Sequence, residues 1–414
     1  MADHRSLLGR VGRLPGLLLL GLMLIGGAAC SEAAAPPALP VETTPVAAPP
    51  PTAPKGAPKG APKEASKEAP PPRTTPTAIP TITPAGPAPA TLAAGYQTRG
   101  RTYYAQGAYD RALAEYNKAL ALQPQDADLY VDRAAAYAGL GQYDHAVADY
   151  TSAIKLHPND AGAYNGRGEA LAAQGALDRA LADYNQAIQL QPDLAVAYTN
   201  RGNLYRRRGI VDRALADFEQ ALHYNPRAAG AYLGRGDIYA SQGDATRAIA
   251  EYNQALQVSP LLPDAYLGRA DAYLAQGNYD RAVSDYSRAL GIAPANAAGY
   301  LGRAHAYVAQ GDDARALADY TQALALDANN AGAFNGRGLI YARRGDYPHA
   351  LADYTQAIRL QPDNATFYFN RALSYRQSGN RDAALADLQK VVLLTNDLAL
   401  RGQVEDQLRA LLAK

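Results

Sequence analysis

Few side chains in this 414-residue sequence are of the types that do chemistry, and they are scattered. The only thiol is that of Cys30, and the six histidines show no pair at the spacing of metal ligands. The sequence has no nucleophile elbow, no His-Glu-x-x-His and no phosphate-binding loop, which are motifs that position a nucleophile, a zinc ion or a nucleotide. We therefore expect a protein that is not an enzyme and that uses no metal and no small-molecule cofactor.

One pattern of charged residues does recur. An arginine appears nine times at a constant interval, and an acid follows each arginine at a second, shorter constant interval. Such a set could form ion pairs, or it could present a row of cations to a ligand. The arginines are Arg99, Arg133, Arg167, Arg201, Arg235, Arg269, Arg303, Arg337 and Arg371, and the acids are Glu115, Asp149, Asp183, Asp217, Glu251, Asp285, Asp319, Asp353 and Asp387.

These arginines belong to a repeat that runs nine times through residues 93–398 without insertion or deletion. We number the places of each unit from 1 to 34, so that unit 1 runs from Ala93 to Asp126 and unit 2 begins at Ala127. Place 4 is aromatic in every unit and place 11 is Tyr in all units but one, a spacing that puts both on one stripe of a helix. Place 15 is always Gly, which predicts a left-handed residue just after this first helix.

A second helix is predicted to begin near place 18 and to end before place 32. Asp stands at place 18 in six units, where its carboxylate could accept the free backbone N–H groups of a helix start. Pro stands at place 32 in seven units and cannot continue the helix. Ala at place 20 in all units, and Gly or Ala at place 8, should let the two helices approach closely. Each unit is therefore predicted to be a helix, a turn and a helix.

These places, with an aromatic residue at place 24 and Ala at place 27 in most units, resemble the tetratricopeptide repeat over all nine units. The resemblance implies an all-α fold, a right-handed α-solenoid of nine helix-turn-helix units in which the first helices line a concave groove. Beyond the repeats, an apolar stripe predicts a capping helix at residues 399–414, which a solenoid needs at its end. That stripe consists of Leu400, Val404, Leu408, Leu411 and Leu412.

Place 7 departs from the family pattern, because the family usually has an apolar residue where this chain has its recurring arginine. We predict that each arginine packs its stem in the core and pairs its guanidinium with the place-23 acid on a neighbouring second helix. The acids recur one for one with the arginines, which favours pairing over a cationic row that faces a ligand.

The residues before the repeats are predicted to direct and tether the protein. Residues 1–29 carry basic residues, an apolar run and four small residues, which is the layout of a signal peptide. Cys30 follows directly, and this resembles the lipobox of bacterial lipoproteins although Gly27 stands where Leu is usual. The resemblance implies lipidation of Cys30 and a membrane anchor on the extracytoplasmic side; cleavage after Ala29, which would give a secreted protein, is the alternative. Residues 30–92, rich in Pro, Ala and Lys, are predicted to be a disordered tether.

Specificity should lie on places that vary between units. In the family, places 2, 5, 9 and 12 point into the groove, and in units 5 to 7 they form an apolar strip beside an acidic edge. The candidate groove residues are Leu233, Asp237, Leu267, Asp271, Leu274, Leu301, His305 and Val308, flanked by Arg206 and Arg207. Two alternatives are that a neighbouring helix covers the leucines, and that these arginines, with Arg343, complement helix C-termini.

The partner is predicted from charge and composition. The formal net charge is +1 and no concentrated basic face is evident, which argues against nucleic acid. The carboxylate clamp of chaperone-binding family members is also absent, since Thr199 stands where Lys is needed. We therefore predict a non-catalytic scaffold that holds an extended protein or peptide segment of the cell envelope in its groove. A binder of cell-wall glycan and an array that assembles with itself are the alternatives.

Overall fold

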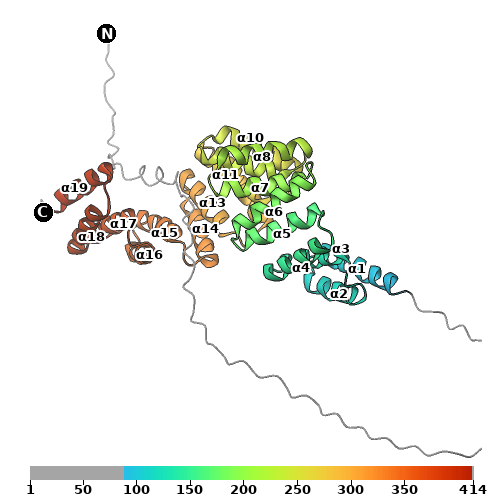
Figure 1. Ribbon diagram of the computed structural model, residues 1–414. Helices are drawn as coiled ribbons and strands as arrows, with labels where there is room; N and C mark the ends of the chain where they lie inside the picture. Colours follow the sequence, from blue (N-terminus) through green and yellow to red (C-terminus); the bar gives the residue numbers. More distant parts are fainter. Residues whose placement is uncertain (1–87, 413–414) are drawn as a thin grey trace, which may run out of the picture. The chain divides into compact units, whose positions relative to one another are not determined.

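The computed structural model describes residues 88–412, so the predicted signal peptide, Cys30 and nearly all of the predicted tether lie outside the described residues. Within residues 88–412 the chain forms nineteen α-helices and no strand (Figure 1). The helices are α1 (Pro89–Ala105), α2 (Tyr109–Leu122), α3 (Ala127–Gly139), α4 (Tyr143–Leu156), α5 (Ala161–Ala173), α6 (Leu177–Leu190), α7 (Ala195–Arg207), α8 (Val211–Tyr224), α9 (Ala229–Ser241), α10 (Ala245–Val258), α11 (Pro263–Ala275), α12 (Tyr279–Ile292), α13 (Ala297–Gln310), α14 (Asp313–Leu326), α15 (Ala331–Arg343), α16 (Tyr347–Leu360), α17 (Ala365–Gln377), α18 (Arg381–Leu394) and α19 (Leu398–Leu412).

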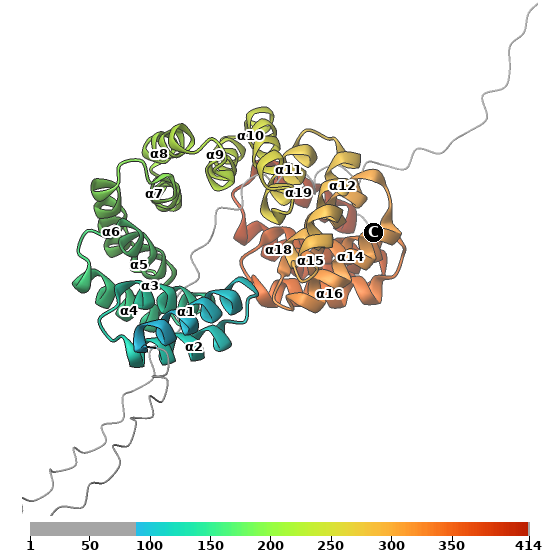
Figure 2. The same cartoon turned by 90° about the vertical axis from the view of Figure 1, so that its right-hand side faces the viewer.

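The helices alternate between two positions in the repeat. The odd-numbered helices α1 to α17 are the first helices of the nine units, and the even-numbered helices α2 to α18 are the second helices. Each first helix packs against its own second helix, which in turn packs against the first helix of the next unit. Consecutive first helices also approach one another, and Figure 2 shows α7 and α9 on the inner side of the curve formed by α6, α8 and α10. The predicted all-α solenoid is confirmed, and we call the side lined by the first helices the inner face.

A left-handed glycine closes each first helix, as predicted. Gly311 has φ 78° and its N–H bonds to the carbonyl of Val308 at 3.0 Å, while the N–H of Asp312 bonds to the carbonyl of Tyr307 at 2.9 Å. This pair of bonds satisfies carbonyls at the helix end that have no partner within the helix. The place-15 glycines with positive φ are Gly107, Gly141, Gly175, Gly209, Gly243, Gly277, Gly311, Gly345 and Gly379.

The second helices begin at place 17, near the predicted start, but their caps differ from the prediction. Their N-cap is place 16, where Asp244 and Asp312 each accept the backbone N–H three residues on, at 2.9 and 3.0 Å. The six place-18 aspartates lie inside the first turn, so the prediction that they cap the helix is wrong. They still lie at the positive end of the helix dipole. Some of them instead link neighbouring units, as Asp280 does by accepting a hydrogen bond from Gln310 Nε2 at 2.6 Å.

The aromatic side chain at place 24 fills the space between units. Phe218 on α8 is fully buried and lies against Gly202 on α7 and Gly234 on α9. A methyl group added at Gly202 would come within 2.8 Å of the Phe218 ring, and one added at Gly234 would come closer still. A side chain added at either glycine would meet the ring unless the ring or the helix shifted. The second helix of one unit is thereby wedged between two first helices.

The helix after the repeats covers the end of the last unit. Val404 on α19 is fully buried and Leu411 is nearly so, while Leu400 and Leu408 pack half-buried on the same cluster. Leu412 is 67% exposed, so its place in the predicted stripe is wrong. Adjacent residues of an α-helix point about 100° apart, so only one of the last two leucines can face the core. None of the helices in residues 88–412 is long and apolar enough to cross a membrane.

Candidate functional site

The recurring arginines form ion pairs with the recurring acids, as predicted. In unit 7, Arg303 Nε donates to Asp319 Oδ2 at 2.7 Å and Arg303 Nη2 donates to Oδ1 at 2.9 Å, which is a two-pronged contact. The hydrogen bond with Asp319 raises the pKa of Arg303 above its ordinary value, so the guanidinium group stays charged. Seven of the nine pairs have this geometry within residues 88–412. In each pair the acid lies on the second helix of the same unit, which packs directly against the first helix that carries the arginine.

The arginines also join consecutive units. The third guanidinium nitrogen of Arg303, Nη1, donates to Ser287 Oγ at 3.0 Å, and Ser287 lies on α12 of the preceding unit. Arg201 reaches Asn185 in the same way at 2.7 Å. Each such arginine connects its own second helix with the previous one, and Asp319 is only 6% exposed. Buried carboxylates and satisfied guanidinium groups identify this row as architecture, not as a ligand-binding surface.

In unit 5 the recurring arginine and acid leave two buried atoms without a hydrogen-bond partner. Its acid is Glu251, one methylene longer than Asp, and only one bond forms, from Arg235 Nη2 to Glu251 Oε1. Arg235 Nε and Glu251 Oε2 are both buried and have no hydrogen-bond partner in the described residues. The preceding unit offers Glu219 at place 25, where most units have Asn, Thr or Ser, so Arg235 lies between two glutamates. A buried donor and a buried acceptor are thus left without a partner at one junction.

We expect Glu251→Asp to stabilise the protein by about 1 kcal/mol, because the shorter side chain restores the two-pronged contact and satisfies both buried atoms. Urea unfolding followed by circular dichroism measures the change in the free energy of unfolding. The converse change in unit 4, Asp217→Glu, is the matched control and should destabilise by a similar amount. An unfolding midpoint for Glu251→Asp that equals or falls below that of the wild type contradicts the prediction.

The candidate groove residues come together on three successive first helices. Places 5, 9 and 12 lie on one helix face, because they are four and three residues apart. We call the resulting array the inner grid: Leu233, Asp237 and Ala240 on α9, Leu267, Asp271 and Leu274 on α11, and Leu301, His305 and Val308 on α13. Its five Leu and Val side chains are half-buried against the cores of their units, so neighbouring helices cover them only in part.

The two aspartates of the inner grid accept hydrogen bonds from tyrosines of the second helices. Tyr252 donates its hydroxyl to Asp237 at 3.0 Å, and Tyr286 donates its hydroxyl to Asp271. Partial desolvation on the inner face raises the pKa of both carboxyl groups above the ordinary value. Asp271 nevertheless remains exposed to solvent. These tyrosine donors were missed by the sequence analysis, which assigned place 24 to the core alone; the constant spacing between places 9 and 24 was the available indication.

His305 occupies the position of these aspartates in unit 7. Its ring meets the ring of Tyr320 edge to face, with centroids 5.7 Å apart. Burial lowers the pKa of His305 to about 4, so the imidazole is uncharged at neutral pH. The grid therefore contains two carboxyl groups and no histidinium.

The flanking arginines have separate partners. Arg206 Nη1 lies 3.2 Å from Asp237 Oδ2, so this arginine binds a carboxylate of the next unit. Arg343 forms an ion pair with Asp313 of the preceding unit. Both arginines also lie in the last turn of their helices, where the alternative that they complement helix C-termini places them. Arg207 is exposed at the end of α7.

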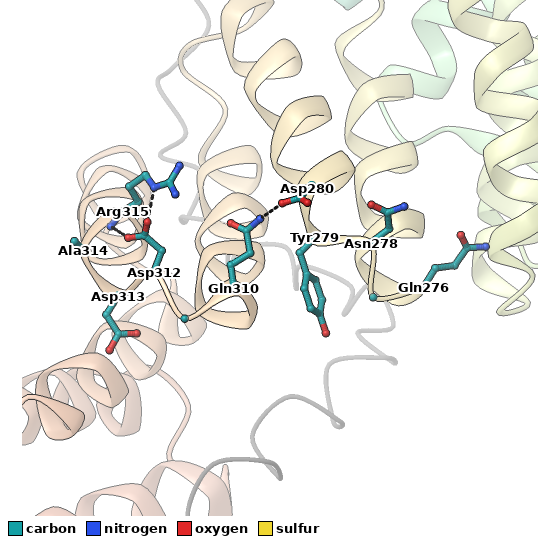
Figure 3. Close-up of a pocket in the computed structure, with 11 residues that line it drawn as sticks. Gln276, Asn278, Tyr279, Asp280, Gln310, Asp312, Asp313, Ala314 and Arg315 are labelled. Carbon is teal, nitrogen blue, oxygen red and sulfur yellow. Dashed lines mark hydrogen bonds and ion pairs between the residues drawn. The ribbon is translucent and has the colours of Figure 1, made fainter.

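A separate depression lies between the turns of units 6 and 7, away from the inner grid (Figure 3). Its polar side chains bond with one another: Gln310 donates to Asp280, and Arg315 donates through Nε to Asp312 at 2.6 Å. These contacts link turns of adjacent units and cap α14, so the depression is accounted for by structure. No group of three or more potential metal ligands occurs within residues 88–412.

Sequence profiles of the tetratricopeptide repeat match most of this chain. A profile described as "TPR repeat" matches residues 100–141, 139–175, 168–209, 304–345 and 338–379. Profiles described as "Tetratricopeptide repeat" match residues 199–263, 242–297 and 365–398. The chain belongs to the tetratricopeptide repeat family.

Several solved structures are similar to this chain at low sequence identity, and the first described here shows the same fold. The APC/C hetero-tetramer Cut9-Hcn1 is 16% identical, with 76% of each chain covered and a TM-score of 0.54. YrrB, described as a TPR protein with an unusual peptide-binding site, is 24% identical over 46% of this chain and 97% of its own, with a TM-score of 0.40. Pseudomonas aeruginosa pilF is 17% identical over 51% of this chain and 97% of its own, with a TM-score of 0.48. No curated protein matches the sequence.

Proposed function

We propose that this protein is a non-catalytic scaffold that binds an extended segment of a partner protein on its inner face. The observation that carries the proposal is the inner grid, in which leucines occupy the same place on α9, α11 and α13. Half-exposed leucines in a row form an apolar surface to which water binds poorly, and a partner's apolar side chains would remove that surface from water. The recurring arginines and acids pair with one another within the repeat, which leaves this surface for binding.

We also propose that the scaffold acts on the extracytoplasmic side of a membrane, with a partner in the cell envelope. This rests on the layout of residues 1–29 and on Cys30, which would carry the lipid anchor. Residues 30–92 would then act as a spacer between the membrane and the repeats. Without acylation of Cys30 the same protein would be secreted.

The proposed function is tested by affinity capture from envelope extracts with full-length protein, followed by mass spectrometry. We expect Leu267→Asp to lose the partner that the wild type recovers, because a carboxylate in the middle of the apolar surface must be desolvated on binding. The matched control is Leu326→Asp, which places the same change at a 40% exposed leucine on the second helix α14. Both variants should keep the wild-type circular dichroism spectrum.

Equal recovery of the partner by wild type and Leu267→Asp contradicts binding on the inner grid. Recovery of glycan, or of only the chain itself, supports the two alternative functions. Running the same capture with Cys30→Ser tests the anchor, since an acylated protein should move from the membrane fraction to the soluble fraction when the acceptor thiol is removed.

A further inference from the structure

Asp271 is at the centre of the inner grid, where the residues at the places before and after it on the three helices are apolar. Leu267 and Leu274 lie one turn before it and one turn after it on α11. Leu301 and Val308 stand at the corresponding places of α13, and Leu233 at that of α9. A single carboxylate in such surroundings is unfavourable unless a cation or several donors compensate it.

Acids at places 6 and 9 of the first helices otherwise have nitrogen donors. Asp132 receives Arg101 Nε at 2.8 Å, Glu169 receives Asn200 Nδ2 at 2.5 Å, and Asp237 faces Arg206 Nη1 at 3.2 Å. Asp271 receives only the hydroxyl of Tyr286, and no cation of residues 88–412 lies against it. The repeat shows where such a cation would come from. Arg206 stands at place 12 of unit 4 and pairs with Asp237 of unit 5, whereas place 12 of unit 5, which precedes Asp271 of unit 6, is Ala240.

The other polar residue beside Asp271 does not compensate the charge. His305 on α13 is uncharged at neutral pH, since burial lowers its pKa to about 4. It therefore neither neutralises Asp271 nor repels an incoming cation. Asp237 on α9 is already paired with Arg206. Partial desolvation raises the pKa of Asp271, which shows that its surroundings disfavour the unpaired carboxylate.

We propose that Asp271 receives the ammonium or guanidinium group of a Lys or Arg in the partner segment, and that apolar side chains on both sides of this residue contact Leu267, Leu274 and Leu301. This inference rests on the proposed function, and it states the chemistry of the partner: a basic residue within an apolar stretch. The incoming cation occupies the place that Arg206 has beside Asp237. Because Asp271 is exposed, the cation can reach it from solvent without rearrangement of the helices.

The test begins with selection of binders from a random 12-residue phage-displayed peptide library on full-length wild-type protein and on full-length Asp271→Lys. Peptides that bind wild type but not Leu267→Asp occupy the inner grid. We expect these peptides to share a Lys or Arg flanked by apolar residues, and we expect Asp271→Lys to select an acid at that position.

The best wild-type peptide is then synthesised with its basic residue and with norleucine in its place, and binding is measured by fluorescence anisotropy. For the basic peptide, Asp271→Asn should weaken binding at least about tenfold, because the amide keeps an acceptor for the Tyr286 hydroxyl but loses the charge. The control Asp193→Asn removes an exposed charge in the turn before α7 and should change nothing. The norleucine peptide should bind wild type and Asp271→Asn alike, since the interaction being measured is absent in both.

The outcomes separate the two proposals. Peptides that depend on Leu267 but show no basic residue, or that bind Asp271→Asn as well as wild type, overturn the role of Asp271 and leave the proposed function standing. Failure to select any peptide that is lost on Leu267→Asp overturns peptide binding by the inner grid and the role of Asp271 with it.

Discussion

Replacing Arg303 by Ala should lower the free energy of unfolding by about 3–5 kcal/mol. The substitution removes both bonds to Asp319 and the bond to Ser287, and it leaves the Asp319 carboxylate buried without a counter-charge. An exposed ion pair contributes far less, but Asp319 is only 6% exposed. Urea unfolding gives the total loss, and amide hydrogen exchange in unit 7 shows whether the loss is local, because repeat arrays can unfold in parts.

The matched control removes both charges together. Arg303→Met combined with Asp319→Leu leaves no buried charge unpaired, and we expect its stability to lie within about 1–2 kcal/mol of wild type. Arg303→Ala should also bind a selected inner-grid peptide with unchanged affinity, provided that the measurement is made where the variant is folded. Loss of peptide binding without loss of stability contradicts the architectural role and supports a row of ligand-facing cations.

The repeat made the architecture predictable. Its fixed period places Gly311 and the glycines equivalent to it at one position, and a left-handed conformation is a local requirement that any one unit reveals. Pairing of arginines with acids was predictable for a similar reason, since both recur in every unit. The additional bond to the preceding unit, such as that of Arg303 to Ser287, was not predicted, because sequence spacing fixes the helix face but not the crossing of two helices. The left-handed glycines and the ion pairs therefore follow from recurrence, and the bonds between units do not.

The candidate site was predictable only in part. Periodicity places Leu267, Asp271 and Leu274 on one helix face, and the structure packs α9 and α13, which carry the equivalent residues, against α11. What could not be predicted is the partner of each polar group. Asp237 and Asp271 are the same residue at the same place, yet only Asp237 meets an arginine. That difference depends on a contact between units, because Arg206 comes from the unit before Asp237. The repeat pattern predicts contacts between residues that recur, and it does not predict the contacts of a residue that is found in one unit only.

The second large effect is expected at the junction of units 4 and 5. Phe218→Ala should cost about 3–5 kcal/mol, because the ring is fully buried and its removal leaves a cavity between three helices. Phe218→Tyr is the matched control and should cost no more than about 1 kcal/mol, since most other units carry Tyr at this place. Thermal or urea unfolding measures both, and equal losses for the two variants contradict a cavity as the cause.

The glycine that faces this ring gives a sharper test, because two effects oppose each other there. Helix propensity alone predicts that Gly234→Ala in α9 stabilises by up to about 1 kcal/mol. The added methyl group would overlap the Phe218 ring, and such overpacking costs about 1–3 kcal/mol, so the single variant should be less stable than wild type. In the Phe218→Ala background the clash is gone, and the same Gly234→Ala change should instead stabilise the protein. A change of sign between the two backgrounds is the expected result of direct contact across the junction, whereas equal effects in both would mean that the ring of unit 4 and the first helix of unit 5 are not packed together.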